Sequence, residues 1–481
     1  MRRKRLPPGQ KGADARGITS CAATGQVMSV LLWLKPGERT FARGGIHPAE
    51  HKELTATCAI ESFVPSSVTV PVSQSLGPAA KPLVEKKDLV KRGDVIAEAP
   101  DGLRIHAPIS GIVKNVQREP HPVLVHDTAI TILAKPTDDE PEFPEQPGWM
   151  ELSREVMLEK IKHGGLVGLG GAAFPTYRKL TLPPDAKIDT LLINGSECEP
   201  YLTCDYRLML EDAEKVVLGA WTIARMIGVN RCLIGVEDNK QPAVEALRAA
   251  IERLGIESLP FPVAMEVVLT ETKYPQGAER QLIEALTGRV VPRRGLPLQV
   301  GIVVQNVATA YACLEAIRND KPVIDRVVTV SGLGIAQPKN LRVPIGTSIA
   351  ALLEHCGGFN GEVVKVLAGG PMMGRALADL NVPVVKGTSG LLFLTRSETN
   401  LDRYGACIGC GECLDVCPLG LEPNKVSQYV EWGRPLETEV YGVLDCFECG
   451  CCSYVCPSNR PLVQFMQVAK TAYRNQARSR Q

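Results

Sequence analysis

Between residues 187 and 271 the spacing of apolar positions changes several times. Short runs of aliphatic residues alternate with longer stretches in which apolar residues recur every three or four positions. The pattern predicts strands at 187–194, 231–239 and 261–271, and helices at 211–228 and 241–255. Each helix ends in a glycine, Gly228 or Gly255, as is common at helix ends. This alternation predicts a layered α/β domain with a mostly parallel sheet.

The stretch 63–135 has a different pattern, in which short β-rich runs are broken by Gly, Pro and Asp. It predicts an all-β module. The run from Val90 to Val113 resembles the barrel-sandwich fold of biotinyl and lipoyl carriers, but residues 99–103 read APDGL and offer no lysine for a cofactor. We therefore expect a docking scaffold at 41–135.

The remaining segments complete the predicted organisation. Residues 1–40 are polar and without period, and indicate a disordered leader or an over-extended start with the true start at Met28. Residues 136–148 are acidic and proline-rich, as in linkers. Residues 325–356 predict two strands joined by a turn and then a short helix. The proposed domains are therefore 41–135, 149–320, 321–394 and 395–481.

Composition narrows the class of protein. The chain has 54 Lys and Arg residues and 53 Asp and Glu residues, so its net charge is close to zero. This balance does not predict the positive electrostatic potential that attracts nucleic acid or an anionic membrane. No apolar run approaches the ~20 residues that cross a bilayer. Sixteen cysteines, eight of them at the regularly spaced positions of two runs near the C-terminus, fit a reducing compartment in which thiols hold metal.

The two runs, CIGCGECLDVCP at 407–418 and CFECGCCSYVCP at 446–457, share one spacing. It is the C-x2-C-x2-C-x3-C-P run of two-cluster ferredoxins, in which the fourth cysteine binds the other cluster. We therefore predict one [4Fe-4S] cluster on Cys407, Cys410, Cys413 and Cys456. The second would lie on Cys446, Cys449, Cys452 and Cys417, which leaves Cys451 over. Structural zinc sites are the alternative, but they usually place two CxxC pairs a dozen or more residues apart.

Residues 163–180, HGGLVGLGGAAFPTYRKL, carry five glycines without the Rossmann spacing. Dense glycines let a backbone approach a phosphate or a flavin ring. After the predicted strand at 187–194 comes NGSECEPYLTCDYR, which places Asn194, Glu197, Glu199 and Asp205 where α/β sheets bind ligands. Solvated turn acids are the alternative interpretation of these carboxylates. No Ser/His/Asp constellation or catalytic cysteine stands out, so we assign no catalytic acid, base or nucleophile.

Several of these motifs together resemble known proteins. GLVGLGGAAFPTYRKL, NGSECEP, GAERQLIEALTG at 277–288 and VVQNVATAY at 303–311 resemble, in order and spacing, the flavoprotein subunit of complex I. The segment RVVTVSGLGIAQPKNLRVPIGTSIAALLEHCGGF resembles the soluble-ligand-binding β-grasp module of the same group. Adding FARGGIHPAEHK at 41–52, GGPMMG at 369–374 and the paired cysteine runs, the chain resembles the C subunit of Rnf ion-translocating electron-transport complexes.

The resemblance implies roles for particular residues. Gly168, Gly170, Gly171 and Phe174 would wall an FMN, with Lys179 near its phosphate. Asn194, Glu197, Glu199 and Asn306 would hold flavin and nicotinamide nucleotide. Two positions depart from the complex I loop, which has Arg where Leu169 stands and Gly where Ala173 stands, so contacts of those residues do not transfer.

The expected fold is a multidomain α/β chain with a β-rich barrel-sandwich N-terminal module, an α/β flavin/NADH-binding domain, a small β-grasp module and a helical two-cluster ferredoxin-like domain. NAD(H) exchanges a hydride and iron-sulfur clusters exchange single electrons, so FMN is expected to connect them. We expect a peripheral subunit on the cytoplasmic side of the cell inner membrane, held by the other subunits of an Rnf-type complex and exchanging electrons with a ferredoxin-type partner. A soluble NADH dehydrogenase or hydrogenase flavoprotein subunit, and a non-enzymatic electron-transfer adaptor, are the alternatives.

Overall fold

The computed structural model describes residues 39–135 and 140–479. The predicted leader, apart from its last two residues, and the alternative start at Met28 lie outside this part of the chain. Residues 136–139 of the predicted linker at 136–148 also lie outside the described part. Its remaining residues, 140–148, form no helix or strand but make hydrogen bonds to other segments. The Pro141 carbonyl accepts from Arg92, and the Phe143 carbonyl accepts from Asn319.

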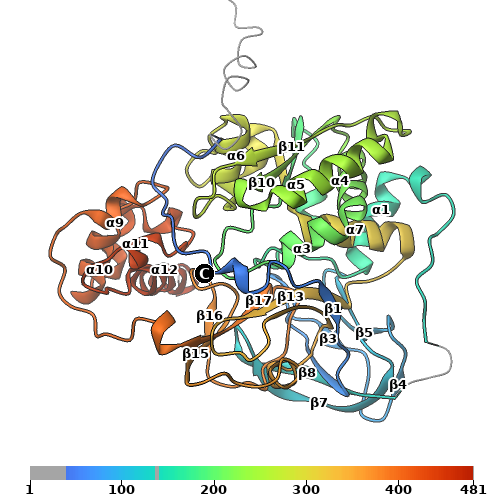
Figure 1. Cartoon of the computed structure of the whole chain (residues 1–481), viewed down its shortest axis with the longest axis horizontal. Helices are drawn as coiled ribbons and strands as arrows, with labels where there is room; N and C mark the ends of the chain where they lie inside the picture. The colour runs from blue at the N-terminus through green and yellow to red at the C-terminus, as the bar shows by residue number, and fades with distance from the viewer. Residues whose placement is uncertain (1–38, 136–139, 480–481) are drawn as a thin grey trace, which may run out of the picture. The chain divides into compact units, whose positions relative to one another are not determined.

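The α/β domain has a four-stranded sheet in the order β11-β10-β9-β12 with every pair parallel, as the alternating pattern predicts. Figure 1 shows β10 and β11 next to α4, α5 and α6. Alternate residues of β9 face opposite layers. Leu191 and Ile193 join the core beneath α4, α5 and α7, and Leu192 joins a second core beneath α6. Gly228 and Gly255 end α4 and α5 with positive φ. The strands are β9 (Thr190–Asn194), β10 (Arg231–Glu237), β11 (Ala264–Thr270) and β12 (Ile302–Asn306). The helices are α1 (Arg154–His163), α2 (Thr176–Leu180), α3 (Cys204–Glu211), α4 (Ala213–Ile227), α5 (Gln241–Leu254), α6 (Glu279–Thr287) and α7 (Val307–Asn319).

The β-rich module consists of two antiparallel sheets, β2-β8-β7-β4 and β3-β5-β6. Along β2 the buried residues Val68 and Val70 alternate with half-buried ones, whereas residues 129–132 of β8 are all buried. The strands are β2 (Ser67–Pro71), β3 (Lys81–Pro82), β4 (Leu89–Val90), β5 (Val95–Glu98), β6 (Arg104–His106), β7 (Gly111–His121) and β8 (Val125–Ala134).

The third unit is a six-stranded sheet in the order β1-β14-β13-β17-β15-β16 with one helix. The antiparallel pair β13–β14 followed by a helix matches the elements predicted at 325–356. β1 comes from before the β-rich module and pairs in parallel with β14, so residues 60–62 belong to this sheet. The elements are β1 (Ile60–Ser62), β13 (Asp325–Ser331), β14 (Lys339–Pro344), α8 (Ile349–His355), β15 (Val363–Ala368), β16 (Arg375–Leu377) and β17 (Gly390–Thr395).

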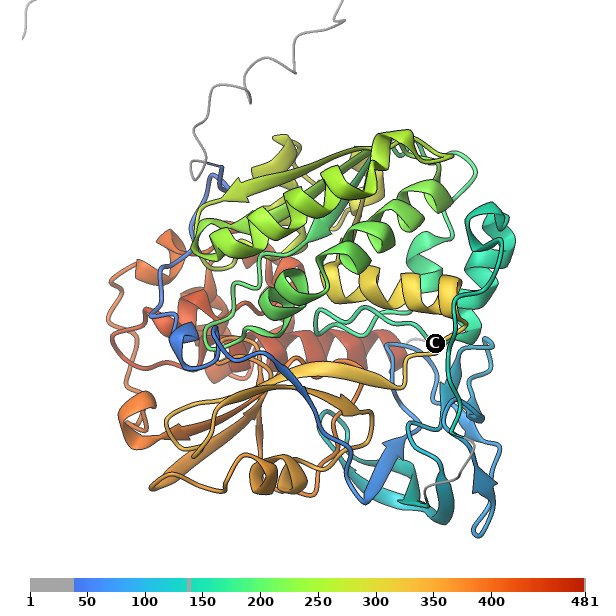
Figure 2. The same ribbon diagram turned by 45° about the vertical axis from the view of Figure 1, so that its right-hand side comes forward.

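The C-terminal unit is helical around its cysteine runs, as predicted. It comprises α9 (Glu412–Asp415), α10 (Pro423–Glu431), α11 (Cys451–Tyr454) and α12 (Leu462–Ser479). The segment before β1, drawn in blue in Figures 1 and 2, connects this unit to the α/β domain. The Gly45 N–H donates to the Val416 carbonyl, and the Ile46 N–H donates to the Tyr274 carbonyl.

Candidate functional site

The eight predicted cluster ligands form two groups, each with cysteines from both runs. Cys407, Cys410, Cys413 and Cys456 line one small cavity together. Burial raises the pKa of Cys413 to about 11, and the neighbouring thiols of Cys407, Cys410 and Cys456 add to the rise. In the second group burial raises the pKa of Cys452, and the thiols of Cys449, Cys446 and Cys417 add to that rise. The structure thus brings the cysteines together in the crossed grouping that the spacing predicts.

The two groups differ in exposure. In the first group the Cys410 residue is exposed, and its neighbour Ile408 is 69% exposed. In the second group Cys417, Cys449 and Cys452 are all buried. The first group therefore reaches the surface at Cys410, with Cys413 buried, and the second group is the more buried, with Cys446 half-buried. Cys451, left over by the spacing, is fully buried in an apolar cluster with Cys449.

The buried group borders the α/β domain. The Tyr274 hydroxyl donates a 2.6 Å hydrogen bond to the Cys449 carbonyl. Gly44, with φ +66°, lies so close to the Cys417 backbone that an added Cβ would be 2.6 Å from the Val416 oxygen. Only glycine accepts both the left-handed backbone and this approach. Sequence reasoning did not assign a role to Tyr274 or to Gly44, although Gly44 lies in the motif FARGGIHPAEHK of the family resemblance.

The predicted polar residues of the α/β domain gather at the carboxyl ends of its strands. Asn194 ends β9 and Asn306 ends β12, and the two are paired in register. The Asn194 side chain donates to the Gly277 carbonyl at 2.7 Å. The Asn306 side chain accepts from the first turn of α7 and donates to Asp205 at 2.6 Å. Both asparagines thus fix the loops around the strand ends.

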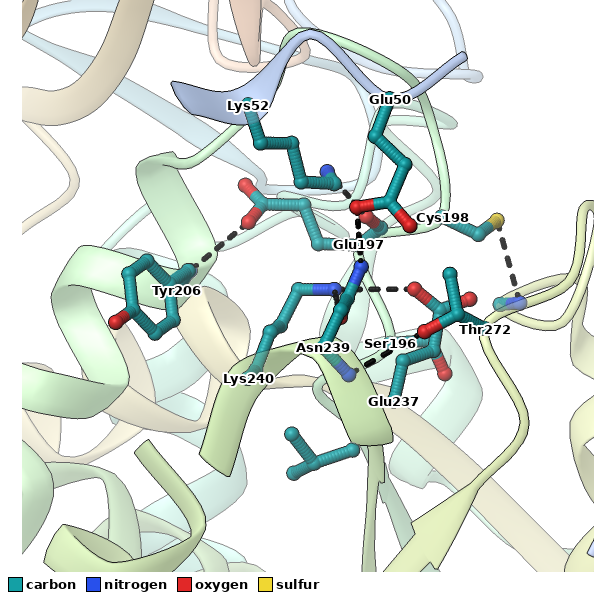
Figure 3. Close-up of polar contacts among 12 residues, drawn as sticks. Glu50, Lys52, Ser196, Glu197, Cys198, Tyr206, Glu237, Asn239, Lys240 and Thr272 are labelled. Carbon is teal, nitrogen blue, oxygen red and sulfur yellow. Dashed lines mark hydrogen bonds and ion pairs between the residues drawn. The ribbon is translucent and has the colours of Figure 1, made fainter. Parts of the chain in front are cut away.

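The acidic turn is also ordered by its own carboxylates (Figure 3). Glu197 accepts from the Asp205 and Tyr206 N–H groups at 2.7 and 3.0 Å, which satisfies the first turn of α3. Glu199 accepts from the Met372 and Met373 N–H groups at 3.0 and 2.8 Å. Burial raises the pKa of Glu199 to about 7 despite these two donors. The interpretation of these acids as solvated turn residues is therefore wrong.

Lys52 is a site residue that sequence reasoning missed. Its ammonium donates to the Glu197 carbonyl at 2.8 Å (Figure 3). It also donates to the carbonyls of Glu199 and Leu202 at 2.9 and 2.6 Å, so one side chain holds the turn. Burial lowers the pKa of Lys52, with the nearby Lys240 as the next cause. The sequence signal for this role is weak, because Lys52 is distinguished only as the last residue of the family motif FARGGIHPAEHK.

A second missed feature is a buried ion pair at the end of β10. Lys240 and Glu237 are 2% and 1% exposed, and their charged groups lie 3.0 Å apart (Figure 3). Lys240 also donates to Asn239 at 2.8 Å, and the Asn239 side chain donates to Glu50. The cost of removing both charges from water offsets much of their attraction, so a buried pair of this kind adds little net stability.

The glycine-rich loop lies against Asn306. A Cβ on Gly170 would be 3.2 Å from the Asn306 Cβ, and the Gly168 N–H donates to the Phe174 carbonyl. The Phe174 residue is 42% exposed, and Lys179 pairs with Glu279 at 2.5 Å. The loop is thus close to one of the predicted site residues, while Lys179 is already partnered.

The two departures from the complex I loop have distinct surroundings. Leu169 is 4% exposed. Its N–H donates to the Thr309 hydroxyl, and its carbonyl accepts from Arg326. Ala173 has φ +50°, and its methyl lies 3.5 Å from where a Cβ on Gly387 would be. Leu169 is part of the largest hydrophobic core cluster and Ala173 packs against it, so both side chains contact the protein's own residues.

Gly171 lines a hollow of about 1120 Å³. Its φ is +105°, and a Cβ built on it would meet nothing within 4 Å. The walls come from the turn of the β7–β8 hairpin, from residues 365–382 and from the cysteine unit between 447 and 467. Of the predicted flavin and nucleotide residues Gly171 alone lines this hollow, and its bare backbone leaves room there for a flat ring.

Four family models match successive parts of the chain. Residues 40–137 match the RnfC barrel sandwich hybrid domain, and residues 161–315 match the Nuo51 FMN-binding domain. Residues 327–376 match the SLBB domain, and residues 406–460 match a 4Fe-4S dicluster domain.

Curated relatives match nearly the whole chain. The C subunit of the proton-translocating ferredoxin:NAD(+) oxidoreductase complex of Clostridium ljungdahlii is 44% identical over 437 residues, covering 90% of this chain and 94% of that protein. The chain belongs to the C-subunit family of Rnf-type ion-translocating oxidoreductase complexes. Another member of this family, the C subunit of the ion-translocating oxidoreductase complex of Rhodobacter capsulatus, is 41% identical over 92% of this chain and 85% of its own length. The C subunit of the Na(+)-translocating ferredoxin:NAD(+) oxidoreductase complex of Acetobacterium woodii is 40% identical over 89% and 96%.

Family membership confirms the predicted fold class and the predicted cofactor classes. The chain is an electron-transfer subunit of an Rnf-type complex, with an FMN-binding domain and a two-cluster iron-sulfur domain. Within residues 39–135 and 140–479, no helix has the length and apolar character needed to cross a bilayer.

Proposed function

We propose that this subunit exchanges electrons with NAD(H) and passes them between NAD(H) and partner redox subunits through FMN and two [4Fe-4S] clusters. Relatives named ferredoxin:NAD(+) oxidoreductase support NAD(H) and a ferredoxin-type protein as the outer partners. The observation that carries the proposal is the direct junction between the flavin-type domain and the buried cysteine group, made by Tyr274 and Cys449.

The ligands we propose are Cys407, Cys410, Cys413 and Cys456 for one cluster and Cys446, Cys449, Cys452 and Cys417 for the other. For FMN and nicotinamide nucleotide we propose the loop residues Gly168, Gly170, Gly171, Phe174 and Lys179, together with the strand-end residues Asn194, Glu197, Glu199 and Asn306. When bound, FMN converts hydride transfer into single-electron transfer. The domain division at residues 40, 135, 148, 320 and 394 is part of the same proposal.

The chain's own residues have a positioning role in this scheme. Lys52 fixes the acidic turn through three backbone carbonyls, and Glu199 bonds the backbone of Met372 and Met373. The Met372 carbonyl in turn lies 2.8 Å from where a Cβ on Gly450 would be, between the ligands Cys449 and Cys452. The acidic turn and the buried cysteine group are thus connected through one short loop, which favours a fixed distance between them.

The exposure of the two cysteine groups supports an order for the clusters. The buried group adjoins the flavin-type domain, and the other group reaches the surface at Cys410. We propose that the buried cluster exchanges electrons with the flavin and that the exposed cluster exchanges them with a partner protein.

The flavin assignment is tested by substitution at Gly171. Gly171→Val places a side chain where the backbone is bare, so FMN content should fall while iron content stays unchanged. Gly358→Val is the matched control, because Gly358 has φ +83° and open space around its Cβ position. If wild-type protein with full iron content cannot be reconstituted with FMN, the flavin assignment is wrong and the chain is a non-enzymatic electron-transfer adaptor.

We also propose that the subunit is peripheral, on the cytoplasmic side of the inner membrane, and that residues 41–135 dock it to the complex. Cells expressing the gene with and without the integral partners should show membrane association only when those partners are present. Association without them would contradict docking through protein. Full solubility with all partners present would favour a soluble dehydrogenase.

A further inference from the structure

Arg460 is a buried arginine beside the exposed cysteine group. The residue is 3% exposed and lines the same cavity as Cys407, Cys410, Cys413 and Cys456. Its Nη1 donates to the Gly405 carbonyl at 3.0 Å. Its Nη2 donates to the Ser427 hydroxyl at 3.2 Å and to Glu431 at 2.6 Å. The two outer nitrogens therefore hold the guanidinium in place.

The third nitrogen of Arg460 is different. Within the described part of the chain, its Nε is buried and has no hydrogen-bond partner. A buried N–H group without an acceptor is costly, and native proteins rarely leave one unpaired. The rings of Tyr404 and Phe465 lie 5.8 and 5.3 Å from the guanidinium carbon and limit the approach of water. Four cysteine sulfurs line the cavity beside Arg460 and are the candidate acceptors for this N–H group.

The internal repeat supplies a comparison. Arg460 follows Cys456 by four residues, and Leu421 follows Cys417 by four residues. Leu421 is buried, and only its backbone N–H reaches a cysteine, donating to the Cys417 sulfur at 3.3 Å. The two cysteine groups thus differ at equivalent positions of the repeat, where one has a guanidinium and the other an aliphatic side chain.

We propose that Arg460 donates its Nε–H to the sulfurs of the cluster held by Cys407, Cys410, Cys413 and Cys456, and thereby raises the reduction potential of that cluster above that of its neighbour. Hydrogen bonds to cluster sulfurs and net charge both set such potentials. Reduction adds one electron and one negative charge to the cluster, so a cationic donor stabilises the reduced form more than the oxidised form. Arg460 is a positioning residue, since it acts on the cluster without exchanging electrons. The inference rests on the two-cluster part of the proposed function and is independent of the flavin.

The test is an anaerobic redox titration of the reconstituted full chain followed by EPR. The wild-type protein is measured first, and full iron content with two cluster EPR signals shows that both clusters are present. A missing cluster, which would contradict the proposed function, is then distinct from an unchanged potential, which would contradict this inference. Arg460→Gln should lower the reduction equilibrium constant of the exposed cluster about tenfold or more, which is about 59 mV for one electron. The buried cluster should keep its potential. Arg434→Gln is the matched control, because Arg434 is exposed and pairs with Glu437 outside this cavity.

A second variant keeps the inference falsifiable if Arg460→Gln fails to hold iron. Arg460→Lys retains the charge without the guanidinium fork, and should give a potential between those of wild type and of a neutral variant. In the wild type, ENDOR of the reduced exposed cluster should show an exchangeable proton coupling that Arg460→Lys alters. An unchanged potential and an unchanged coupling in a variant with full iron would overturn the proposal, as would equal shifts at both clusters.

Discussion

The Tyr274 hydroxyl lies 2.6 Å from the carbonyl oxygen of Cys449 and donates a hydrogen bond to it. Tyr274 is 2% exposed and belongs to the α/β domain, whereas Cys449 is in the buried cysteine group. The bond forms inside an apolar cluster that also includes Ile46 and Cys451. Two domains that are distant in sequence therefore meet at a buried polar contact next to a proposed cluster ligand.

Tyr274→Phe should weaken this junction. It leaves a buried carbonyl without its donor, which costs about 1–3 kcal/mol. We expect a lower thermal midpoint and slower reduction of the buried cluster by NADH, with unchanged iron and FMN content. The matched control is Tyr473→Phe, since Tyr473 donates a similar bond to the Leu436 carbonyl at an exposed position. Equal effects of the two substitutions would contradict a special role for the Tyr274 contact.

Gly44→Ala should disturb the backbone around Cys417. The added methyl would lie 2.6 Å from the Val416 oxygen, on a residue with φ +66°. Overpacking of this kind costs about 1–3 kcal/mol, and the left-handed backbone adds about 1 kcal/mol. Gly433→Ala shares the positive φ, at +71°, but its Cβ meets nothing within 4 Å. We expect the EPR signal of the buried cluster to change in Gly44→Ala alone, and an equal change in both variants would disprove the clash.

The crossed ligand assignment predicts which cluster each single substitution affects. Cys456→Ser should perturb the cluster of Cys407, Cys410 and Cys413, although Cys456 is in the other run. Cys417→Ser should perturb the cluster of the second run. EPR of the reduced single variants reports both signals separately. Two unperturbed clusters in Cys456→Ser would reject the assignment.

Lys386 predicts a pH dependence of stability. It is 1% exposed, its ammonium donates to the Gly165 carbonyl at 2.6 Å, and burial lowers its pKa to about 7. The lowered pKa means that the folded chain binds fewer protons than the unfolded chain between pH 7 and 10.5. Burial of Lys386 therefore destabilises the fold most below about pH 7, and this destabilisation shrinks as pH rises across the window.

Thermal unfolding of wild type and Lys386→Met from pH 6 to pH 9 tests this dependence. Between pH 7 and 9 the difference in unfolding free energy should change in favour of wild type by about 1.4 kcal/mol per pH unit. Lys114→Met, at an exposed position on β7, should show no such slope. A flat difference for Lys386→Met would mean that the buried lysine keeps its ordinary pKa.

The sequence was most informative where local chemistry decides structure. The alternation of β9, β10 and β11 with helices followed from the period of apolar residues and from Gly228 and Gly255, whereas β12 was not predicted as a strand. The shared spacing of the cysteine runs predicted their grouping. Each helix, strand and cysteine run is specified within about twenty residues, and the crossed grouping follows from comparing the two runs.

Contacts between distant segments were not predictable in this way. Lys52 bonds the turn at 197–202, and β1 joins a sheet whose other strands begin at residue 325. A lone lysine or a three-residue strand has no periodicity, and its partner depends on tertiary packing. The roles of Asn194 and Glu197 in fixing their own loops were likewise visible only once the strand ends had been brought together.

The most direct measurement is anaerobic reduction of the reconstituted full chain by NADH, followed by flavin absorbance and freeze-quench EPR. The account predicts that flavin absorbance bleaches first, that the buried cluster is reduced next, and that the cluster at Cys410 is reduced last. In Cys417→Ser the flavin should still bleach while reduction of the exposed cluster slows strongly. Full-iron protein that binds FMN yet shows no flavin bleaching with NADH, or an exposed cluster reduced at the wild-type rate in Cys417→Ser, would contradict it.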